Sequence, residues 1–522
     1  MLYRVLLCIS ALAGFAIAAP PPEMTSDALE VRSDTGGSDV RKTEDHDLQQ
    51  LERRWLFKIG SYFLIVNATP WNMTLVGKHS YQMKQFDFPK TIKAGTSKRI
   101  YIQGIGRQDD AGEATYAFKD LPGRPDLEFK YSGRYGEYGY PGGPGAGIQF
   151  KKLKTLNNKH GSFHQLDWYL ENNVPFIIAS SEENPRKPSV WPWLVSTNPP
   201  EDWMHSIYPR IACLKLRELA MPGTHNSGMS RFHRGSFFGA GWNTKNQMLN
   251  VSMQLKYGAR YIDFRPSKTG GKWAAGHFGF DCGNWHGGNG EYLEDVIDSL
   301  NEFTRRNQEL IILHLDHGLN SDTFKGNKRA KMSQEEWEDV MKRLERINYR
   351  VKNRGNESDL TSLRVSDFIP GRPAVIIVVD DYHYKKTPKG TPDYDSQITV
   401  DTSAFADKGI FNGSQFPQHD DYANTNNQKK MVADQMEKMK RYRKSPESKM
   451  FLLSWFLTQR LNPIIFNAVQ ANRALIELLW PRMSRSTYPN IISVDAYPDN
   501  RDLVALAMAI NYHFAPRCEI SS

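Results

Sequence analysis

The sequence predicts an α/β protein in which a parallel barrel of strands and helices follows an antiparallel, sandwich-like β domain. From Trp203 onwards, short apolar runs alternate with amphipathic helical patterns, which is typical of parallel strands joined by helices. Between Trp55 and about Ser180, strand-like runs are separated by glycine, proline, asparagine and aspartate, and no long helical pattern intervenes. With 522 residues, the chain has room for two or three domains.

The first 54 residues predict export. Residues 1–18 contain a basic Arg4, a short apolar run and a closing Ala16-Ile17-Ala18, which is typical of a signal peptide. Residues 19–54 are polar, acidic and almost without aromatic side chains, so we expect a disordered propeptide or linker. The Arg53-Arg54 pair at its end suggests proteolytic maturation, although an ordinary charged linker would look the same. Five sequons agree with a secreted, extracellular glycoprotein, at Asn67, Asn72, Asn250, Asn356 and Asn412.

Residues 55–183 are expected to form the β-rich accessory domain, and residues 184–202 a proline-rich linker. The domain shows no catalytic constellation, so we expect a binding or packing role. Its glycine-rich segment 140–147 lacks the Gly-Lys-Ser/Thr of a phosphate loop and favours a hairpin tip. The strand candidates are residues 61–66, 98–102, 115–118 and 174–178.

Residues 203–522 are expected to form the barrel. Helical spacing of apolar residues predicts a helix over 293–303, and a capping box at Ser333–Glu336 opens another that runs to Ile347. Residues 429–443 predict a basic helix. Residues 382–428 form a long polar loop, which in a compact domain is usually a lid or a substrate rim. The predicted strands are residues 214–221, 260–265, 273–278, 309–316, 374–381, 450–457 and 490–496.

Charge and cysteine content narrow the possible partners. The net charge of +9 suits an anionic membrane surface or a phosphate-bearing substrate. No Lys/Arg stripe or nucleic-acid motif is present, so nucleic acid is not an expected partner. No stretch after the signal is long and apolar enough to cross a bilayer.

After the signal peptide, three cysteines remain; we expect Cys213 to pair with Cys518, which leaves Cys282 as a spare thiol.

Polar side chains stand at the ends of several predicted barrel strands. The carboxyl ends of barrel strands meet at one mouth, where barrel enzymes carry their active sites. Period-two alternation places Asp263 and Arg265 on one face of their strand, and His314 and Asp316 on one face of theirs. The mouth is therefore expected to gather His225, Asn226, Asp263, Arg265, His277, His314, Asp316 and Asp495.

Two histidines and one arginine suit the cleavage of a phosphodiester. One imidazole removes a proton from the attacking oxygen, the other protonates the leaving oxygen, and the guanidinium neutralises charge on the phosphate. Each residue also has a plainer interpretation. The turn at His225 could be an ordinary cap, Asp263–Arg265 a structural pair, and His277 a core histidine. His286 competes for the acid role, while His314 and His317 are expected to be mainly structural.

Several ordered motifs resemble one known family. They are Glu218–Gly228, Gly258–Arg265, Gly276-His277, Glu309–Leu313 and Pro489–Asp495. Over roughly residues 203–515 the chain resembles the phosphatidylinositol-specific phospholipase C X-domain proteins, and it looks closest to their secreted fungal branch. The resemblance implies a distorted TIM barrel and a lipid phosphodiesterase.

The resemblance also implies a role for each catalytic candidate. His225 would be the general base that activates the inositol 2-hydroxyl, and Asp495 would orient it. His277 would be the general acid that protonates the departing diacylglycerol oxygen, and Arg265 would bind the phosphate.

The sequence departs from both known patterns of this family. Asn226 stands where the metal-independent bacterial members have aspartate, and Asp316 stands where they have a basic residue. The arginine that holds their inositol ring is replaced in this sequence around Asp380-Asp381. The calcium-dependent members match Asn226, Asp263 and Asp316 but have an acid at the position of Arg265. Substrate contacts are therefore expected from Asn226, Asp263, Asp316 and Asp380. Oxygens of the first three could hold Ca²⁺ or Mg²⁺. Because Arg265 should occupy or repel that site, we expect no cofactor.

Three functions remain open from the sequence. The first is a secreted phospholipase C that acts on phosphatidylinositol or a lipid-anchor glycan at a membrane surface. The second is a metal-dependent phosphodiesterase for another lipid headgroup, such as choline or glycerol. The third is a non-catalytic protein whose β domain binds a surface glycan or lipid while the barrel is a degenerate scaffold.

Overall fold

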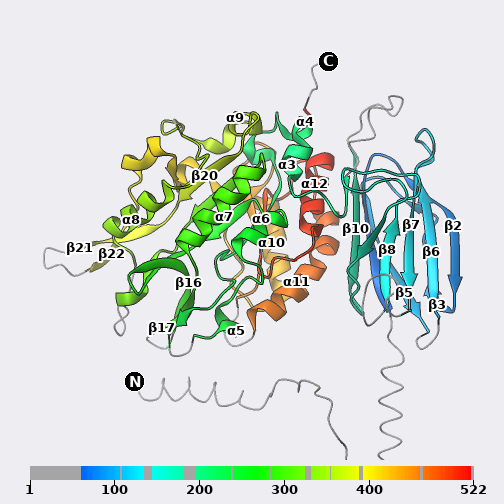
Figure 1. The fold of residues 1–522 in the computed structure, drawn as a ribbon, viewed down its shortest axis with the longest axis horizontal. Helices are drawn as coiled ribbons and strands as arrows, with labels where there is room; N and C mark the ends of the chain where they lie inside the picture. The colour runs from blue at the N-terminus through cyan, green and yellow to red at the C-terminus, as the bar shows by residue number, and fades with distance from the viewer. Residues whose placement is uncertain are drawn as a thin grey trace, which may run out of the picture.

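The computed structural model describes residues 60–105, 109–134, 144–180, 195–236, 239–281, 284–323, 331–352, 354–386, 392–458 and 463–518. The predicted signal peptide, the propeptide or linker, most of the proline-rich segment and Cys282 lie outside these residues. The chain forms a β-rich part and an α/β part that lie side by side, with α11 (Ile464–Leu479) and α12 (Asp502–His513) between them (Figure 1).

Two sheets make up the β-rich part. The first has the order β11-β10-β1-β5-β3 and the second the order β4-β2-β6-β7-β8-β9. The strands of the first sheet are β1 (Gly60–Ala68), β3 (Met83–Phe86), β5 (Thr96–Gly104), β10 (Asn173–Ala179) and β11 (Val195–Ser196). Those of the second are β2 (Met73–Tyr81), β4 (Thr91–Ile92), β6 (Ala111–Ala117), β7 (Asp126–Ser132), β8 (Gly145–Gln149) and β9 (Phe163–Leu166).

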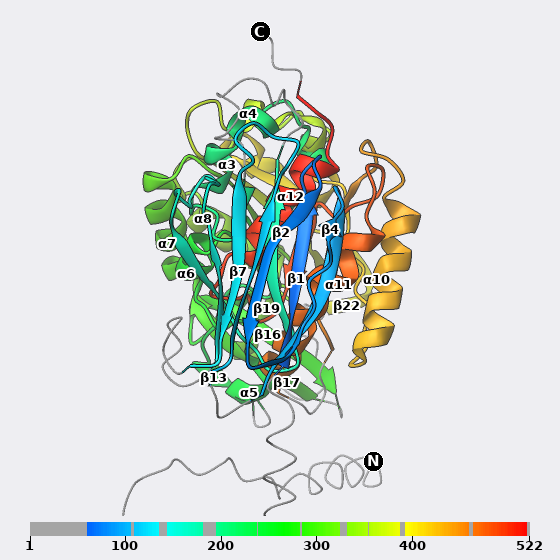
Figure 2. The same cartoon turned by 90° about the vertical axis from the view of Figure 1, so that its right-hand side faces the viewer.

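The central strand β1 of the five-stranded sheet is buried on both faces. Phe63 and Ile65 of β1 join a core with Phe129 of the second sheet, whereas Leu64 and Val66 join the core of the α/β part. The sheet therefore lies against α11 and α12, and in Figure 2 it stands in front of these two helices. The expectation of a purely antiparallel domain was wrong at one pair, because β1 and β10 run parallel. A strand buried on both faces lacks the polar alternation of a solvent-facing antiparallel strand.

An eight-stranded, entirely parallel sheet forms the centre of the α/β part, in the order β23-β20-β18-β14-β12-β26-β25-β24. This half-barrel sheet is consistent with the expected distorted TIM barrel. Its strands are β12 (Met221–Thr224), β14 (Tyr261–Phe264), β18 (Leu310–Leu315), β20 (Ala374–Val379), β23 (Ile410–Asn412), β24 (Gln418–His419), β25 (Met450–Trp455) and β26 (Ile491–Val494).

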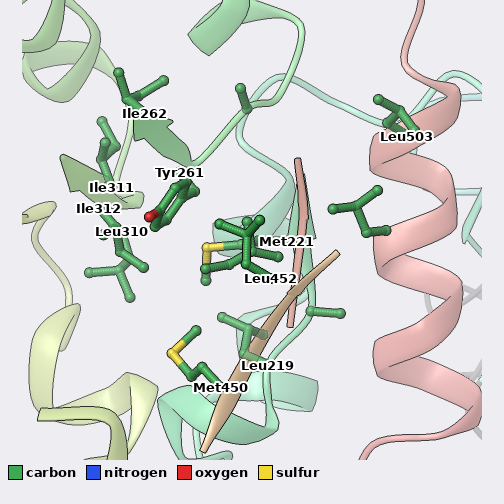
Figure 3. Close-up of a cluster of buried hydrophobic side chains, with 14 of the residues drawn as sticks. Leu219, Met221, Tyr261, Ile262, Leu310, Ile311, Ile312, Met450, Leu452 and Leu503 are labelled. Atoms are coloured by element: carbon green, nitrogen blue, oxygen red, sulfur yellow. The ribbon is translucent and has the colours of Figure 1, made fainter. Parts of the chain in front are cut away.

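Apolar side chains fill the space between these strands. Figure 3 shows Met221, Tyr261 and Leu452 gathered there, with Leu503 of α12 on the far side of the strands. Arg260 and Glu309 form an ion pair of 2.7 Å with both side chains fully buried. The helices around the sheet are α3 (Trp203–Ser206), α4 (Tyr208–Ile211), α5 (Gly241–Thr244), α6 (Val251–Lys256), α7 (Leu293–Arg306), α8 (Gln334–Leu344), α9 (Val365–Phe368) and α10 (Gln428–Tyr442).

Three sequence expectations about this part need correction. The predicted strand 214–221 is wrong for most of its length: Leu216–Glu218 is a short 3-10 helix, and β12 instead passes through Pro222 and Gly223. The parallel order of the sheet leaves Pro222 in register with Ile492. The supposed long loop 382–428 contains β23 and β24, which belong to the parallel sheet, and a hairpin of β21 (Tyr382–Lys386) and β22 (Pro392–Thr399).

The third correction concerns residues 273–278. They belong to β16 (Lys272–Asp281), which lies in a separate five-stranded sheet of order β13-β17-β16-β15-β19 and not in the parallel one. The cause is the turn at Gly270 and Gly271, whose φ values of +56° and +73° return the chain antiparallel to β15. The other strands are β13 (Arg234–Gly235), β15 (Pro266–Thr269), β17 (Asn284–Tyr292) and β19 (Leu319–Asn320).

The predicted disulfide is present. Cys213 is bonded to Cys518, which ties the segment after α12 to the segment that precedes β12.

Candidate active site

The candidate active site lies where neighbouring parallel strands end. His225 follows β12, Arg265 follows β14, Asp316 follows β18 and Asp495 follows β26. These strands are adjacent in the order β18-β14-β12-β26, so their carboxyl ends present the four side chains to one mouth. The sequence predicted this gathering, and the hydrogen bonds of the structure show how the groups meet.

His225 is held by Asp495. The Nδ1–H of His225 donates to Asp495 Oδ1 over 2.8 Å, and the two side chains are only 12% and 2% exposed. Because an ionised carboxylate only accepts, Nδ1 carries the proton and Nε2 keeps a lone pair. The ring also stacks on Phe456, at 3.8 Å between centroids and 5° between planes. His225 is therefore fixed in the tautomer and orientation of a base.

Arg265 lies between two carboxylates. Its Nη2 is 3.4 Å from Asp263 Oδ2, and its Nε is 3.4 Å from Asp316 Oδ1. Burial opposes the charge of the guanidinium, but Asp263 and Asp316 outweigh burial and raise the pKa of Arg265. Burial likewise opposes ionisation of Asp316, while His317 and Arg265 outweigh it and lower the pKa of Asp316. A fixed cation therefore stands at the centre of the mouth.

These contacts decide how well the predicted ligand set fits a metal ion. Asn226, Asp263 and Asp316 were the candidates, and two of them already neutralise Arg265. Asp263 Oδ2 also accepts the backbone N–H of Asn226 over 2.9 Å. Asn226 Oδ1, Asp263 Oδ1 and Asp316 Oδ1 accept no hydrogen bond within the described residues. A divalent cation placed between the two carboxylates would nevertheless meet the guanidinium of Arg265 there, and its charge opposes a metal ion in this set. Asn226 and Asp263 are 1% and 7% exposed and hold the turn that carries His225.

His277 reaches the mouth from β16, outside the parallel sheet. Its Nδ1–H donates to the backbone carbonyl of Thr244 over 2.9 Å, which leaves Nε2 for the second proton. Burial is the largest cause that lowers the pKa of His277, and the neighbouring His225 and Arg265 add to it. The hydrogen bond to Thr244 and the charge of Asp495 act in the opposite direction, and together these effects lower the pKa of His277 to about 4. The hydrogen bond to Thr244 brings His277 next to the segment whose Gln247 donates to the backbone carbonyl of His225 over 2.7 Å.

We expect kcat/KM for phosphodiester cleavage to peak on the acidic side of neutrality. A general acid must hold its proton in the free enzyme, and with a pKa of about 4 the protonated fraction of His277 falls as pH rises. A bound anionic phosphate raises this pKa, so kcat should persist to higher pH than kcat/KM. Both profiles can be measured from about pH 4 to about pH 9. A kcat/KM plateau confined to alkaline pH would contradict the acid role of His277.

The other predicted polar residues lie on β18, on β17 and in the segments that follow β18 and β20. His314 is 4% exposed, stacks on Tyr261 at 5.6 Å and lies 4.0 Å from Asp380, whose side chain is 40% exposed. His317 bonds Asp316 over 2.8 Å. His286 pairs in register with Gly279, further along the β16–β17 hairpin than His277.

Sequence reasoning missed several residues of this region. Gln418 and Asp420, which bond each other over 3.2 Å, come from the segment expected to be a loop. Phe456 falls within the predicted strand 450–457 and lies just after the end of β25, but nothing in the sequence marks it as a stacking partner. Thr244, Asn246 and Gln247 follow no strand, so the strand-end rule could not find them.

Comparisons with known proteins give structural likenesses only. No protein-family model and no curated protein sequence matches the chain. The chain is similar to a mutant of phosphatidylinositol-specific phospholipase C from Staphylococcus aureus, at 13% identity and a TM-score of 0.41, over 60% of this chain and 98% of that one. It is also similar to phosphatidylinositol-specific phospholipase C from Listeria monocytogenes, at 17% identity and a TM-score of 0.35, over 57% of this chain and 95% of that one. The function therefore has to be inferred from the residues of this chain.

Proposed function

We propose that this protein is a lipid phosphodiesterase of the phospholipase C type that cleaves phosphatidylinositol or a related lipid. The observation that carries the proposal is the meeting of three groups at one mouth: His225 hydrogen-bonded to Asp495, His277 with its Nε2 left for a second proton, and Arg265 between two carboxylates. These groups match the three needs of phosphodiester cleavage, which are a base, an acid and a cation for the phosphate.

In the proposed reaction, His225 Nε2 removes the proton of the inositol 2-hydroxyl while its oxygen attacks phosphorus. Asp495 stabilises the imidazolium that results, through the Nδ1 hydrogen bond. The bond between phosphorus and the diacylglycerol oxygen breaks, and this oxygen takes the Nε2 proton of His277, which enters the step as an imidazolium and leaves it as a neutral imidazole. Arg265 balances the negative charge on the phosphate oxygens. The products are a cyclic inositol phosphate and diacylglycerol.

The headgroup side of the mouth is rich in carboxylates. Asp316, Asp380 and Asp420 are close enough to influence one another's ionisation, and burial raises the pKa of Asp380 and of Asp420. Carboxylate oxygens accept hydrogen bonds from hydroxyl groups, which suits a polyol such as inositol. The same charges favour a second candidate, a diesterase for a cationic headgroup such as choline.

Exposed apolar side chains near the mouth support a lipid surface as the partner. Trp242 of α5 is 49% exposed and lies two residues before Thr244, which holds His277. Phe466, at 64%, stands in the first turn of α11, which follows β25 and therefore starts at the mouth side of the sheet. Such side chains are typical of surfaces that contact membranes or proteins.

Among the described residues, none of the helices has the length and apolar character needed to cross a membrane. The Cys213–Cys518 disulfide agrees with the proposal of a secreted protein.

A panel of phospholipid vesicles tests the headgroup and the metal requirement together. Phosphatidylinositol, phosphatidylcholine and phosphatidylglycerol are offered with and without EDTA, and released headgroup is measured. We expect cleavage of phosphatidylinositol at an unchanged rate with EDTA, because Arg265 takes the place of a cation between Asp263 and Asp316. Activity that EDTA abolishes would contradict this site, and turnover of phosphatidylcholine alone would favour the second candidate.

A further inference from the structure

The short segment Thr244–Gln247 contacts both histidines of the mouth. Thr244 accepts the hydrogen bond of His277 through its backbone carbonyl, at 2.9 Å. Gln247 Nε2 donates to the backbone carbonyl of His225 over 2.7 Å and to that of Val494 over 3.0 Å. The segment therefore ties the ends of β12 and β26 to the strand that carries His277.

Asn246 acts on the carboxylate that orients His225. Its Nδ2 donates to Asp495 Oδ1 over 3.0 Å, and this is the oxygen that also accepts the Nδ1–H of His225. The backbone carbonyl of Asn246 accepts the N–H of Ala496 over 2.7 Å, so backbone and side chain both hold the end of β26. At 2% exposure, Asn246 makes these contacts away from solvent, where a hydrogen bond to a charged group is worth most.

Asn226 in turn holds Asn246. Asn226 Nδ2 donates to Asn246 Oδ1 over 3.1 Å, whereas Asn226 Oδ1 has no hydrogen-bond partner within the described part of the chain. What position 226 supplies is therefore a donor. Its φ of +46° lies in the left-handed region, which asparagine and aspartate tolerate better than most residues.

We infer that Asn246 is a positioning residue for the His225–Asp495 pair, and that Asn226 is an amide because it must donate to Asn246. The inference rests on the proposed function, in which His225 is the base. An aspartate at position 226 would have no N–H to give. The amide of Asn246 would then turn its NH₂ towards the new carboxylate, and its oxygen would face Asp495 Oδ1.

Hydrogen bonds to neighbouring residues hold the segment Thr244–Gln247 in place. The backbone N–H groups of Asn246 and Gln247 both donate to the carbonyl of Met229. Beneath them, the buried carboxylate of Glu291 accepts the Ser230 hydroxyl over 2.6 Å and the Val251 N–H over 3.3 Å. Ser230 and Val251 flank the segment that contains Thr244–Gln247, and both bond Glu291. These bonds fix the position of Thr244–Gln247.

The test is the titration of the His225 ring by nitrogen NMR, alongside kcat and KM, in the full chain and in Asn246→Ala and Asn226→Asp. Without the hydrogen bond from Asn246, the negative charge of Asp495 Oδ1 interacts more strongly with the His225 imidazolium. The pKa of His225 should therefore rise by about one unit. We expect kcat to fall about 10-fold to 100-fold with little change in KM, because the base is misaligned. Asn226→Asp should move both quantities in the same direction, and its near-identical shape keeps the fold if Asn246→Ala does not.

Asn511→Ala is the matched control. Asn511 is a fully buried amide that exchanges two backbone hydrogen bonds with Ala220, of 2.8 Å and 2.9 Å, away from the mouth. It should lower the melting temperature and leave the His225 titration unchanged. The inference is overturned if Asn246→Ala loses stability as Asn511→Ala does but keeps the pKa of His225 and kcat. If the wild type cleaves no phosphodiester, the proposed function fails, while the titration still decides the role of Asn246.

Discussion

Replacement of His225 by alanine is expected to lower kcat for phosphodiester cleavage by about 10³-fold, with KM nearly unchanged, as for the loss of a general base. The imidazole is the group whose Nε2 takes the proton, and its Nδ1–H bond of 2.8 Å to Asp495 keeps it ready to do so. The variant retains Arg265, so the phosphate should still bind. The measurement is steady-state release of headgroup from phosphatidylinositol vesicles.

His205→Ala serves as the control for this variant. His205 lies in α3, its side chain is exposed, and only its backbone N–H bonds Glu309, at 2.8 Å. It should keep wild-type kinetics. If His225→Ala kept wild-type turnover on every phospholipid offered, the catalytic account would be wrong and a non-catalytic binding role would take its place.

Replacement of Arg265 should be almost as damaging, and its two variants separate charge from geometry. Arg265→Ala removes the cation that faces the phosphate, and a loss of about 10²-fold to 10³-fold in kcat/KM is expected. It also leaves Asp263 and Asp316 facing each other without the guanidinium that lies 3.4 Å from each. Arg265→Lys keeps a positive charge but has no planar fork to reach both carboxylates and the phosphate, so it should recover only part of the loss.

Arg346→Ala is a suitable control for the arginine variants. Arg346 forms an exposed ion pair of 3.7 Å with Asp298, and pairs of this kind contribute little. Circular dichroism and the melting temperature should be recorded for all variants, because the loss of Arg265 exposes two carboxylates to mutual repulsion. An Arg265→Lys protein with full kcat/KM would show that a point charge is sufficient.

The sequence predicted the long buried strands and part of the site for a clear physical reason. Residues 309–316 and 374–381 are continuous apolar runs, and strands buried on both faces need such runs. The polar residues that end them come together because parallel strands present their carboxyl ends to one side. This rule placed Arg265, Asp316 and Asp495 at strand ends without knowledge of any contact. His225 also lies at a strand end, although the strand before it is Met221–Thr224 and not the predicted 214–221.

The remaining features depend on tertiary contacts that leave no periodic pattern. β23 and β24 have three and two residues, too short for alternation to show. β16 looked like a sheet strand, but the turn at Gly270-Gly271 sends it into another sheet. Asn246 and Gln247 act from an irregular segment between α5 and α6, so only their hydrogen bonds reveal them. The hydrogen bond from Asn226 to Asn246 offers a structural reason for an amide at position 226. The sequence alone suggested a weakened or metal-binding site there.

Phosphorus NMR of the water-soluble product from phosphatidylinositol vesicles tests the central claim most directly. If His225 activates the neighbouring 2-hydroxyl and His277 protonates the departing diacylglycerol oxygen, a cyclic inositol phosphate should appear first, and it should be absent with His225→Ala. A wild-type protein that releases no phosphorus-containing headgroup, or releases phosphatidic acid or lysolipid instead, would contradict the account.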